Sequence, residues 1–234
     1  MDRVDATLSG NTFTNNQAGG QGVGGSGLGG ALYIGNTVYA GEKSGGTINI
    51  VDSTFHGNSA TAESANSSGG ALYLDGNMAA TLSVSGSTLT GNSAAETGAG
   101  IYLDTPETYY VGIKHSTFAH NTIGNGGTGG AGLHMYNGNG TNLLISHSVF
   151  TGNDGGNGNL CAVGECYFEL DHSFVSDAGE QAGCRTISDM GGNQIGSNEA
   201  PLDARLQDLG LYGGSTFTFL PAADSPLVDA GDAN

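Results

Sequence analysis

Residues 54–58 read Thr-Phe-His-Gly-Asn, and residues 70–74 read Gly-Ala-Leu-Tyr-Leu. The first string recurs along the chain with an Asn three residues after an apolar residue. The apolar residues of the five copies are Phe13, Phe55, Leu89, Phe118 and Phe150, and a degraded sixth copy contains Phe174. Because the copies are separated by stretches of variable length, each copy is predicted to be one coil of a solenoid whose loops accommodate the insertions.

Apolar and polar residues alternate within each copy. Ile48 and Ile50 precede Phe55, Leu82 and Val84 precede Leu89, and the second string alternates in the same way. Spacing by two is the period of a β-strand with one buried face, and no segment keeps a helical period over ten residues. The sequence therefore predicts an all-β protein, a right-handed parallel β-helix (a solenoid) whose coils lie about 4.8 Å apart.

The repeat also suggests how the chain is organised. Coils of variable length are expected over residues 1–198, and residues 199–234 are expected to form an irregular C-terminal cap over the open end of the solenoid. The chain begins almost inside a coil and without a signal sequence, so we expect a piece of a longer exported protein. Unpaired strand edges at an uncapped end would permit end-to-end self-association.

Equivalent residues of neighbouring coils lie above one another in such a fold. The Asn of each copy is predicted to join a structural ladder of internal amide hydrogen bonds: Asn16, Asn58, Asn92, Asn121 and Asn153. The central residue of the second string is predicted to point outward, giving a row of rings: Tyr33, Tyr73, Tyr102 and His134. This row is either a platform for sugar rings or a set of side chains that pack well across strands.

Two other sets of stacked residues are candidate metal ligands. His115, His147 and His172 lie close to the start of successive copies, and they indicate either a transition-metal site or a surface row without a ligand. Asp75 and Asp104 follow the same strand in neighbouring coils. They are candidates for a Ca²⁺ site, for the carboxylate pair of a hydrolase, or for a solvated edge. No cofactor is certain from the sequence.

The three cysteines leave at least one thiol outside any internal disulfide. Cys161 and Cys184 lie at nearly the same distance after Phe150 and Phe174, so a disulfide between adjacent coils is possible. A local pair between Cys161 and Cys166 is the rival, and an oxidised pair of either kind would fit an exported protein.

Charge excludes several function classes. Five Lys and Arg against 22 Asp and Glu give a formal charge of −17, which is incompatible with nucleic acid and with an anionic membrane surface. No apolar run is long enough for a membrane span. The few cations are scattered over different coils, whereas a lyase acting on uronates needs cations at one site.

Two families are similar to this chain. The Gly-Gly-Ala-aliphatic and Phe-x-x-Asn strings resemble those of the polymorphic outer membrane proteins, and the last third resembles the ending of choice-of-anchor Q domain proteins. The segments that carry the second resemblance are residues 184–196, 203–206, 213–221 and 225–232. The resemblance implies an exported, cell-surface or secreted β-helix that is usually followed by a surface anchor. The chain lacks the Cys that this family normally carries after Asn-x-Ile-Gly, so the usual partner of Cys184 is missing.

These observations favour a non-catalytic, exported cell-surface β-helix with an adhesive or envelope-structural role. Its expected partner is a cell-surface glycan or protein. The alternative is a carbohydrate-active β-helix enzyme, of the polysaccharide lyase or glycoside hydrolase type.

Overall fold

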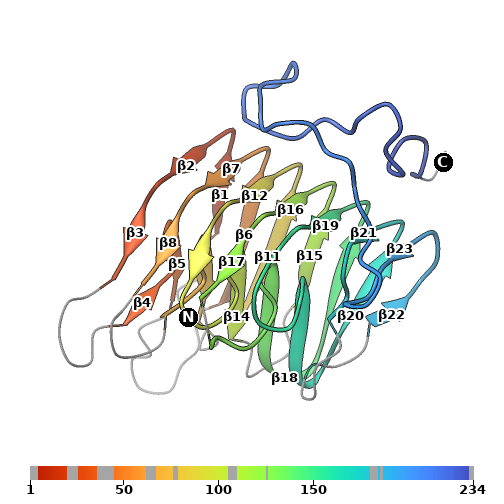
Figure 1. The fold of residues 1–234 in the computed structure, drawn as a ribbon. Coiled ribbons are helices and arrows are strands. Elements are labelled where there is room, and N and C mark those ends of the chain that lie inside the picture. Colours follow the sequence, from red (N-terminus) through yellow and green to blue (C-terminus); the bar gives the residue numbers. More distant parts are fainter. Residues whose placement is uncertain are drawn as a thin grey trace.

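The computed structural model describes residues 5–19, 26–35, 45–61, 67–75, 79–104, 110–124, 126–179, 184 and 187–231. Strands that are parallel to one another stack into four sheets, and the chain winds through these sheets coil after coil (Figure 1). The described residues contain no α-helix, and none of their segments could cross a membrane as a helix. The predicted all-β, right-handed parallel β-helix is therefore confirmed.

The largest sheet has ten strands. They are β1 (Ala6–Ser9), β5 (Leu32–Ile34), β6 (Gly45–Val51), β10 (Leu72–Leu74), β11 (Ala79–Ser85), β14 (Ile101–Asp104), β15 (Val111–Lys114), β18 (Leu133–Ser146), β20 (Leu160–Asp171) and β22 (Ile187–Asp189). In the early coils this sheet consists of two columns, with β5, β10 and β14 in one and β1, β6, β11 and β15 in the other. The long strands β18 and β20 run through both columns and join them.

The second sheet has seven strands and carries the Phe-x-x-Asn copies. They are β2 (Thr12–Thr14), β7 (Thr54–His56), β12 (Thr88–Thr90), β16 (Thr117–Ala119), β19 (Val149–Thr151), β21 (Phe174–Val175) and β23 (Gln194–Ile195). The third sheet contains β3 (Gln17–Ala18), β8 (Ser59–Ala60), β13 (Ser93–Ala94) and β17 (Thr122–Ile123), and the fourth contains β4 (Gly27–Leu28) and β9 (Ser67–Ser68).

The core lies inside the coils and is built from residues that stack on their equivalents. Phe13 and Phe55 are paired in register with ring centroids 4.6 Å apart, and Phe118 and Phe150 are paired at 4.4 Å. Leu89 stands between Phe55 and Phe118 in the same column. Full burial of one such aromatic side chain contributes about 1.5–3 kcal/mol, so the repeated apolar residue stabilises the stacking of the coils together with the other buried residues of the core.

The turn that leads into the second sheet needs a left-handed backbone in every coil. Gly10, Asp52 and Gly86 occupy this position in the early coils, with φ of 66°, 46° and 59°. His115 and His147 occupy it later, with φ of 48° and 49°. Gly, Asp and His tolerate this conformation better than branched residues do, because their side chains crowd the backbone less.

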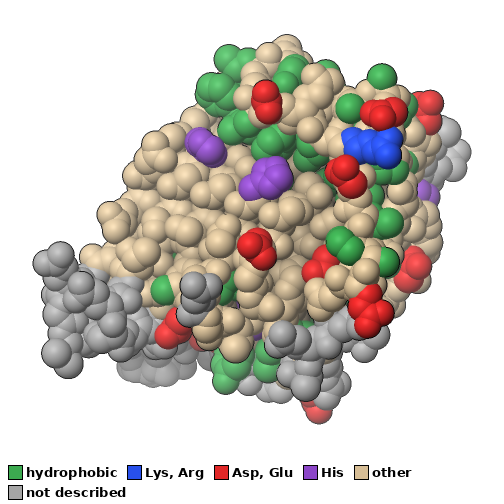
Figure 2. Space-filling model, in the orientation of Figure 1, with side chains coloured by type: hydrophobic (Ala, Val, Ile, Leu, Met, Phe, Trp, Pro, Cys, Tyr) green, Lys and Arg blue, Asp and Glu red, His purple; other side chains and the backbone are tan. Residues whose placement is uncertain are grey.

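Part of the C-terminal segment, which the sequence predicts to be an irregular cap, contacts the second sheet. A short antiparallel pairing, with bridges between Leu206 and Pro221 and between Gly210 and Thr218, folds the segment into a loop over the second sheet (Figure 1). The Thr54 hydroxyl donates a 2.7 Å hydrogen bond to the Phe217 carbonyl. Figure 2 shows hydrophobic side chains gathered on this overlying segment.

Candidate functional site

The four predicted rings form one continuous stack, which we call the ring column: Tyr33, Tyr73, Tyr102 and His134. β5, β10, β14 and β18 each contribute one ring because parallel in-register pairing places the same strand position above its equivalent. Centroid separations are 5.4, 4.9 and 5.3 Å, with interplanar angles of 15°, 15° and 19°. The faces of Tyr73 and Tyr102 are therefore turned to neighbouring rings.

This arrangement limits how the two inner tyrosines can contact a sugar ring. A sugar ring stacks on an open aromatic face, whereas the stack leaves Tyr73 and Tyr102 with their edges and hydroxyls for a ligand. The two alternatives for this row were not exclusive, because the rings pack on one another and still line an open surface.

His134 does not point into solvent as predicted, because only 4% of its surface is exposed. Its Nδ1 accepts a 3.4 Å hydrogen bond from the Gly130 backbone N–H. Burial lowers the pKa of His134 to about 4, because a charged imidazolium loses its hydration there. The imidazole is therefore neutral at physiological pH, and accepting at Nδ1 places its proton on Nε2.

A groove of about 550 Å³ runs beside the ring column, and we call it the tyrosine groove. Its lining includes Tyr73, Tyr102 and His134 of the column, together with the carboxylates of Glu96 and Asp104. The remaining lining residues are Leu28, Ser68, Thr97, Thr128, Tyr136 and Val163. No Lys or Arg is among the lining residues that the structure describes. The groove therefore offers hydroxyls, carboxylates and ring edges.

The carboxylates of Glu96 and Asp104 make the groove anionic, and Asp75 adds a further carboxylate beside the ring column. The Tyr33 hydroxyl donates a 2.9 Å hydrogen bond to Asp75, and burial together with this carboxylate raises the pKa of Tyr33 to about 12. Burial, followed by the charges of Asp104 and Asp75, also raises the pKa of Tyr73. Asp104 has a raised pKa because it is partly buried and because Asp75 repels its charge. Because the pKa values of Tyr33, Tyr73 and Tyr102 are all raised, these three phenols are protonated and can donate hydrogen bonds at neutral pH.

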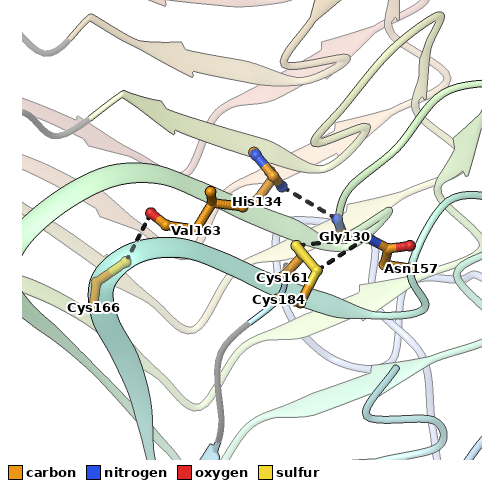
Figure 3. Close-up of a disulfide and its surroundings, with 7 residues drawn as sticks. All are labelled: Gly130, His134, Asn157, Cys161, Val163, Cys166 and Cys184. Carbon is orange, nitrogen blue, oxygen red and sulfur yellow. Dashed lines mark hydrogen bonds between the residues drawn. A yellow bond between two sulfur atoms is a disulfide. The ribbon is translucent and has the colours of Figure 1, made fainter. Parts of the chain in front are cut away.

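The end of the ring column is fixed by a disulfide (Figure 3). Cys161 pairs with His134 in the register of β18 and β20, so it occupies the next position of the column. It is bonded to Cys184, so of the two predicted pairings the one between coils is formed. Cys166 is buried outside this disulfide, and its thiol donates a 3.4 Å hydrogen bond to the Val163 carbonyl. The Asn157 side-chain amide donates to the Cys184 sulfur at 3.0 Å.

The asparagine residues form the predicted ladder of hydrogen bonds between the coils. In each step the side-chain NH₂ donates to the Oδ1 of the next Asn at 2.8–2.9 Å, and the five members are Asn16, Asn58, Asn92, Asn121 and Asn153. Asn153 ends the ladder by donating to Asn159. The backbone N–H of each of the first four ladder residues also donates to the same Oδ1, as in Asn58 to Asn92 at 2.9 Å.

A second ladder was missed by the sequence analysis. Ser53, Ser87, Ser116 and Ser148 each accept a hydrogen bond at 3.1–3.2 Å from the backbone N–H of the equivalent residue in the preceding coil. Each hydroxyl then donates to the carbonyl two residues earlier in its own chain, as Ser53 does to Val51. The signal was present in the sequence, because a Ser lies two residues before the apolar residue in these copies.

The histidine row is explained by backbone geometry. His115, His147 and His172 stack with ring centroids 5.2 and 5.3 Å apart, and all three occupy the left-handed turn position. Asp171 lies 2.8 Å from Nδ1 of His172. Across the described part of the chain, no three His, Cys, Asp or Glu side chains are grouped so that they could hold a metal ion.

The fold and the site define a class: a parallel β-helix with an anionic, tyrosine-lined groove on one side. Residues 1–175 match the family model of the right handed beta helix region, so the chain belongs to that family. No curated protein and no solved structure matches the chain.

Proposed function

We propose that this protein is a non-catalytic β-helix of an exported, cell-surface protein and that it binds carbohydrate in the tyrosine groove. The observation that carries the proposal is the lining of the groove, where hydroxyls and carboxylates stand beside a rigid column of rings. Sugar hydroxyls both donate and accept hydrogen bonds, so they match phenols, Ser and Thr hydroxyls and carboxylates.

Two features support the proposed location of the protein outside the cell or at the cell surface. The Cys161–Cys184 disulfide fits an oxidising compartment, because disulfides are rare where thiols are kept reduced. The low content of Lys and Arg and the formal charge of −17 suit a protein that stays soluble while presenting one face to a glycan. Adhesion to a surface glycan, or cross-linking of envelope polymers, is the role that follows.

The test is a glycan array probed with the intact protein, with and without Ca²⁺. The proposal predicts signals on a restricted set of oligosaccharides. Signals that require Ca²⁺ would assign the Asp75–Asp104 edge a cation that bridges protein and sugar. Silence on the array under both conditions would contradict a carbohydrate-binding role.

A second candidate, glycoside hydrolysis, is favoured by one observation. The pKa of Asp104 is raised by burial and by Asp75, and a glycosidase needs one carboxyl that keeps its proton beside one that is ionised. Incubation with an oligosaccharide that binds on the array distinguishes the two functions. New reducing ends that disappear in Asp104→Asn would establish the enzyme, whereas binding without cleavage supports the non-catalytic role.

A further inference from the structure

We propose that the tyrosine groove takes a linear amino-sugar chain that lies along the solenoid axis with one sugar unit beside each coil. This inference rests on the proposed carbohydrate-binding function and specifies its ligand. It is carried by the spacing of the ring column, the way the column ends, and the charges that line the groove.

The spacing sets the direction of the ligand. Neighbouring rings are 4.9–5.4 Å apart, so a phenol or imidazole edge is repeated once in every coil along the axis. This repeat is close to the length of one pyranose unit in an extended chain. A chain that runs along the axis therefore meets an equivalent donor at every sugar, whereas a chain across the coils would meet only one.

The ends of the column set the length of the ligand. Tyr33 begins the column and is 48% exposed, whereas His134 is buried and is followed in register by the disulfide-bonded Cys161. Tyr73, Tyr102 and His134 line the groove, and Tyr33 stacks on Tyr73 and extends the column beyond the groove lining. A chain along the axis therefore meets a ring edge in four coils. Donors at fixed positions on packed strands lose little conformational freedom on binding, which favours a chain that contacts all four.

The charges select the chemistry of the sugar. Asp104 and Glu96 line the groove, and the described lining offers no cation to balance them. Asp75 accepts the hydrogen bond of the Tyr33 hydroxyl at the exposed end of the ring column. An ammonium group beside Asp104 would relieve the repulsion between Asp104 and Asp75. A uronate would add to that repulsion, and an N-acetylated amine would bring no charge. Neutral His134 leaves the anionic balance unchanged.

The experiment is isothermal titration of the intact protein with glucosamine oligomers of two to six units at mildly acidic pH and low salt. Each added unit gains a hydrogen bond to a carboxylate, a phenol or the imidazole of His134, so affinity should rise about tenfold per unit up to the tetramer and then level off. The fully N-acetylated tetramer should bind at least about tenfold more weakly, and a uronate tetramer should not bind.

Variants locate the effect. Asp104→Asn should weaken binding of the glucosamine tetramer about tenfold, because one ion-paired hydrogen bond is lost. Asp208→Asn is the matched control, since it removes the same charge from an exposed residue of the C-terminal segment outside the groove lining. Its affinity should equal that of the wild type.

The outcomes are separable. A tetramer that binds no tighter than the dimer would overturn the one-unit-per-coil arrangement. Equal affinity for acetylated and free-amine chains, or equal losses in Asp104→Asn and Asp208→Asn, would overturn the amino-sugar assignment. None of these results would contradict carbohydrate binding if the glycan array is positive. The proposed carbohydrate-binding function fails only if the array is silent.

Discussion

Asn92 stands at the middle of the asparagine ladder and is fully buried. Its Oδ1 accepts from the backbone N–H and the side chain of Asn58, and its NH₂ donates to Asn121 and to the Phe55 carbonyl. Asn92→Ala leaves several of these groups buried without partners, so the free energy of unfolding should fall by about 3–5 kcal/mol.

Asn16→Ala is the control for this prediction. Asn16 is exposed at the first described coil and donates the same kind of hydrogen bond to Asn58. The loss should be about 1 kcal/mol, because water replaces the missing amide. Urea denaturation of both variants measures the difference. If both variants lost the same free energy of unfolding, burial would not explain the stabilising effect of the ladder.

His134 predicts a pH dependence of stability. Its pKa is lowered in the folded protein, so the unfolded chain binds the proton first as the pH falls. The contribution of neutral His134 to stability is fully present above pH 6.5, the ordinary pKa of histidine. It is lost as the pH falls towards 4, the pKa of His134 in the folded protein. Over that range this residue alone should lower the free energy of unfolding by about 3 kcal/mol.

His134→Phe keeps a ring in the column and removes the titration. Thermal unfolding between pH 7 and pH 4 should therefore show a steeper loss of stability in the wild type than in the variant. Parallel curves for the two proteins would contradict a buried, neutral imidazole.

The raised pKa of Asp104 predicts the opposite pH dependence, in which stability falls as the pH rises. Its folded-state pKa is raised, so its contribution to stability is complete below the ordinary value of 3.8 and is lost as the pH rises through the folded value. Asp104→Asn removes the repelled charge, so its melting temperature should exceed that of the wild type at pH 7. The difference should vanish at pH 3, and a variant that melts below the wild type at pH 7 would disprove the account of this carboxyl.

At the scale of elements, the disulfide joins Cys161 of β20 to Cys184, which follows the degraded copy around Phe174. Cys161 and Cys184 are 23 residues apart in the sequence, and closing a loop of this length stabilises a fold by about 3 kcal/mol. Cys184→Ser should lower the free energy of unfolding by this amount. It should also weaken glycan binding, because Cys161 follows His134 in the ring column.

Thiol labelling checks the pairing itself. The chain denatured without reductant should take up one label, at Cys166, and the reduced chain should take up three. Labelling of Cys184 before reduction would show that Cys161 is paired with Cys166 or is unpaired.

At the scale of the molecule, the sequence predicted what depends on the repeat. The spacing of Phe55 and Asn58 is the same in neighbouring copies, and parallel in-register strands turn equal spacing into stacked columns. The burial of His134 was not predictable from the alternation of strand residues, because its contacts include the Gly130 backbone N–H outside the strand. The path of the C-terminal segment could not be predicted from the repeat either, because its contact with Thr54 joins residues 163 positions apart in the sequence.

The central claim is that glycan binds through the hydroxyls of the ring column. The most direct test is isothermal titration of the best ligand from the array into the Tyr73→Phe/Tyr102→Phe double variant. This change removes two phenols and keeps the stacked rings, and Tyr110→Phe is the matched control because Tyr110 is exposed and does not line the groove. The account predicts an affinity at least about tenfold lower for the double variant and unchanged for the control. Equal affinity in all three proteins would place the ligand elsewhere and contradict the account.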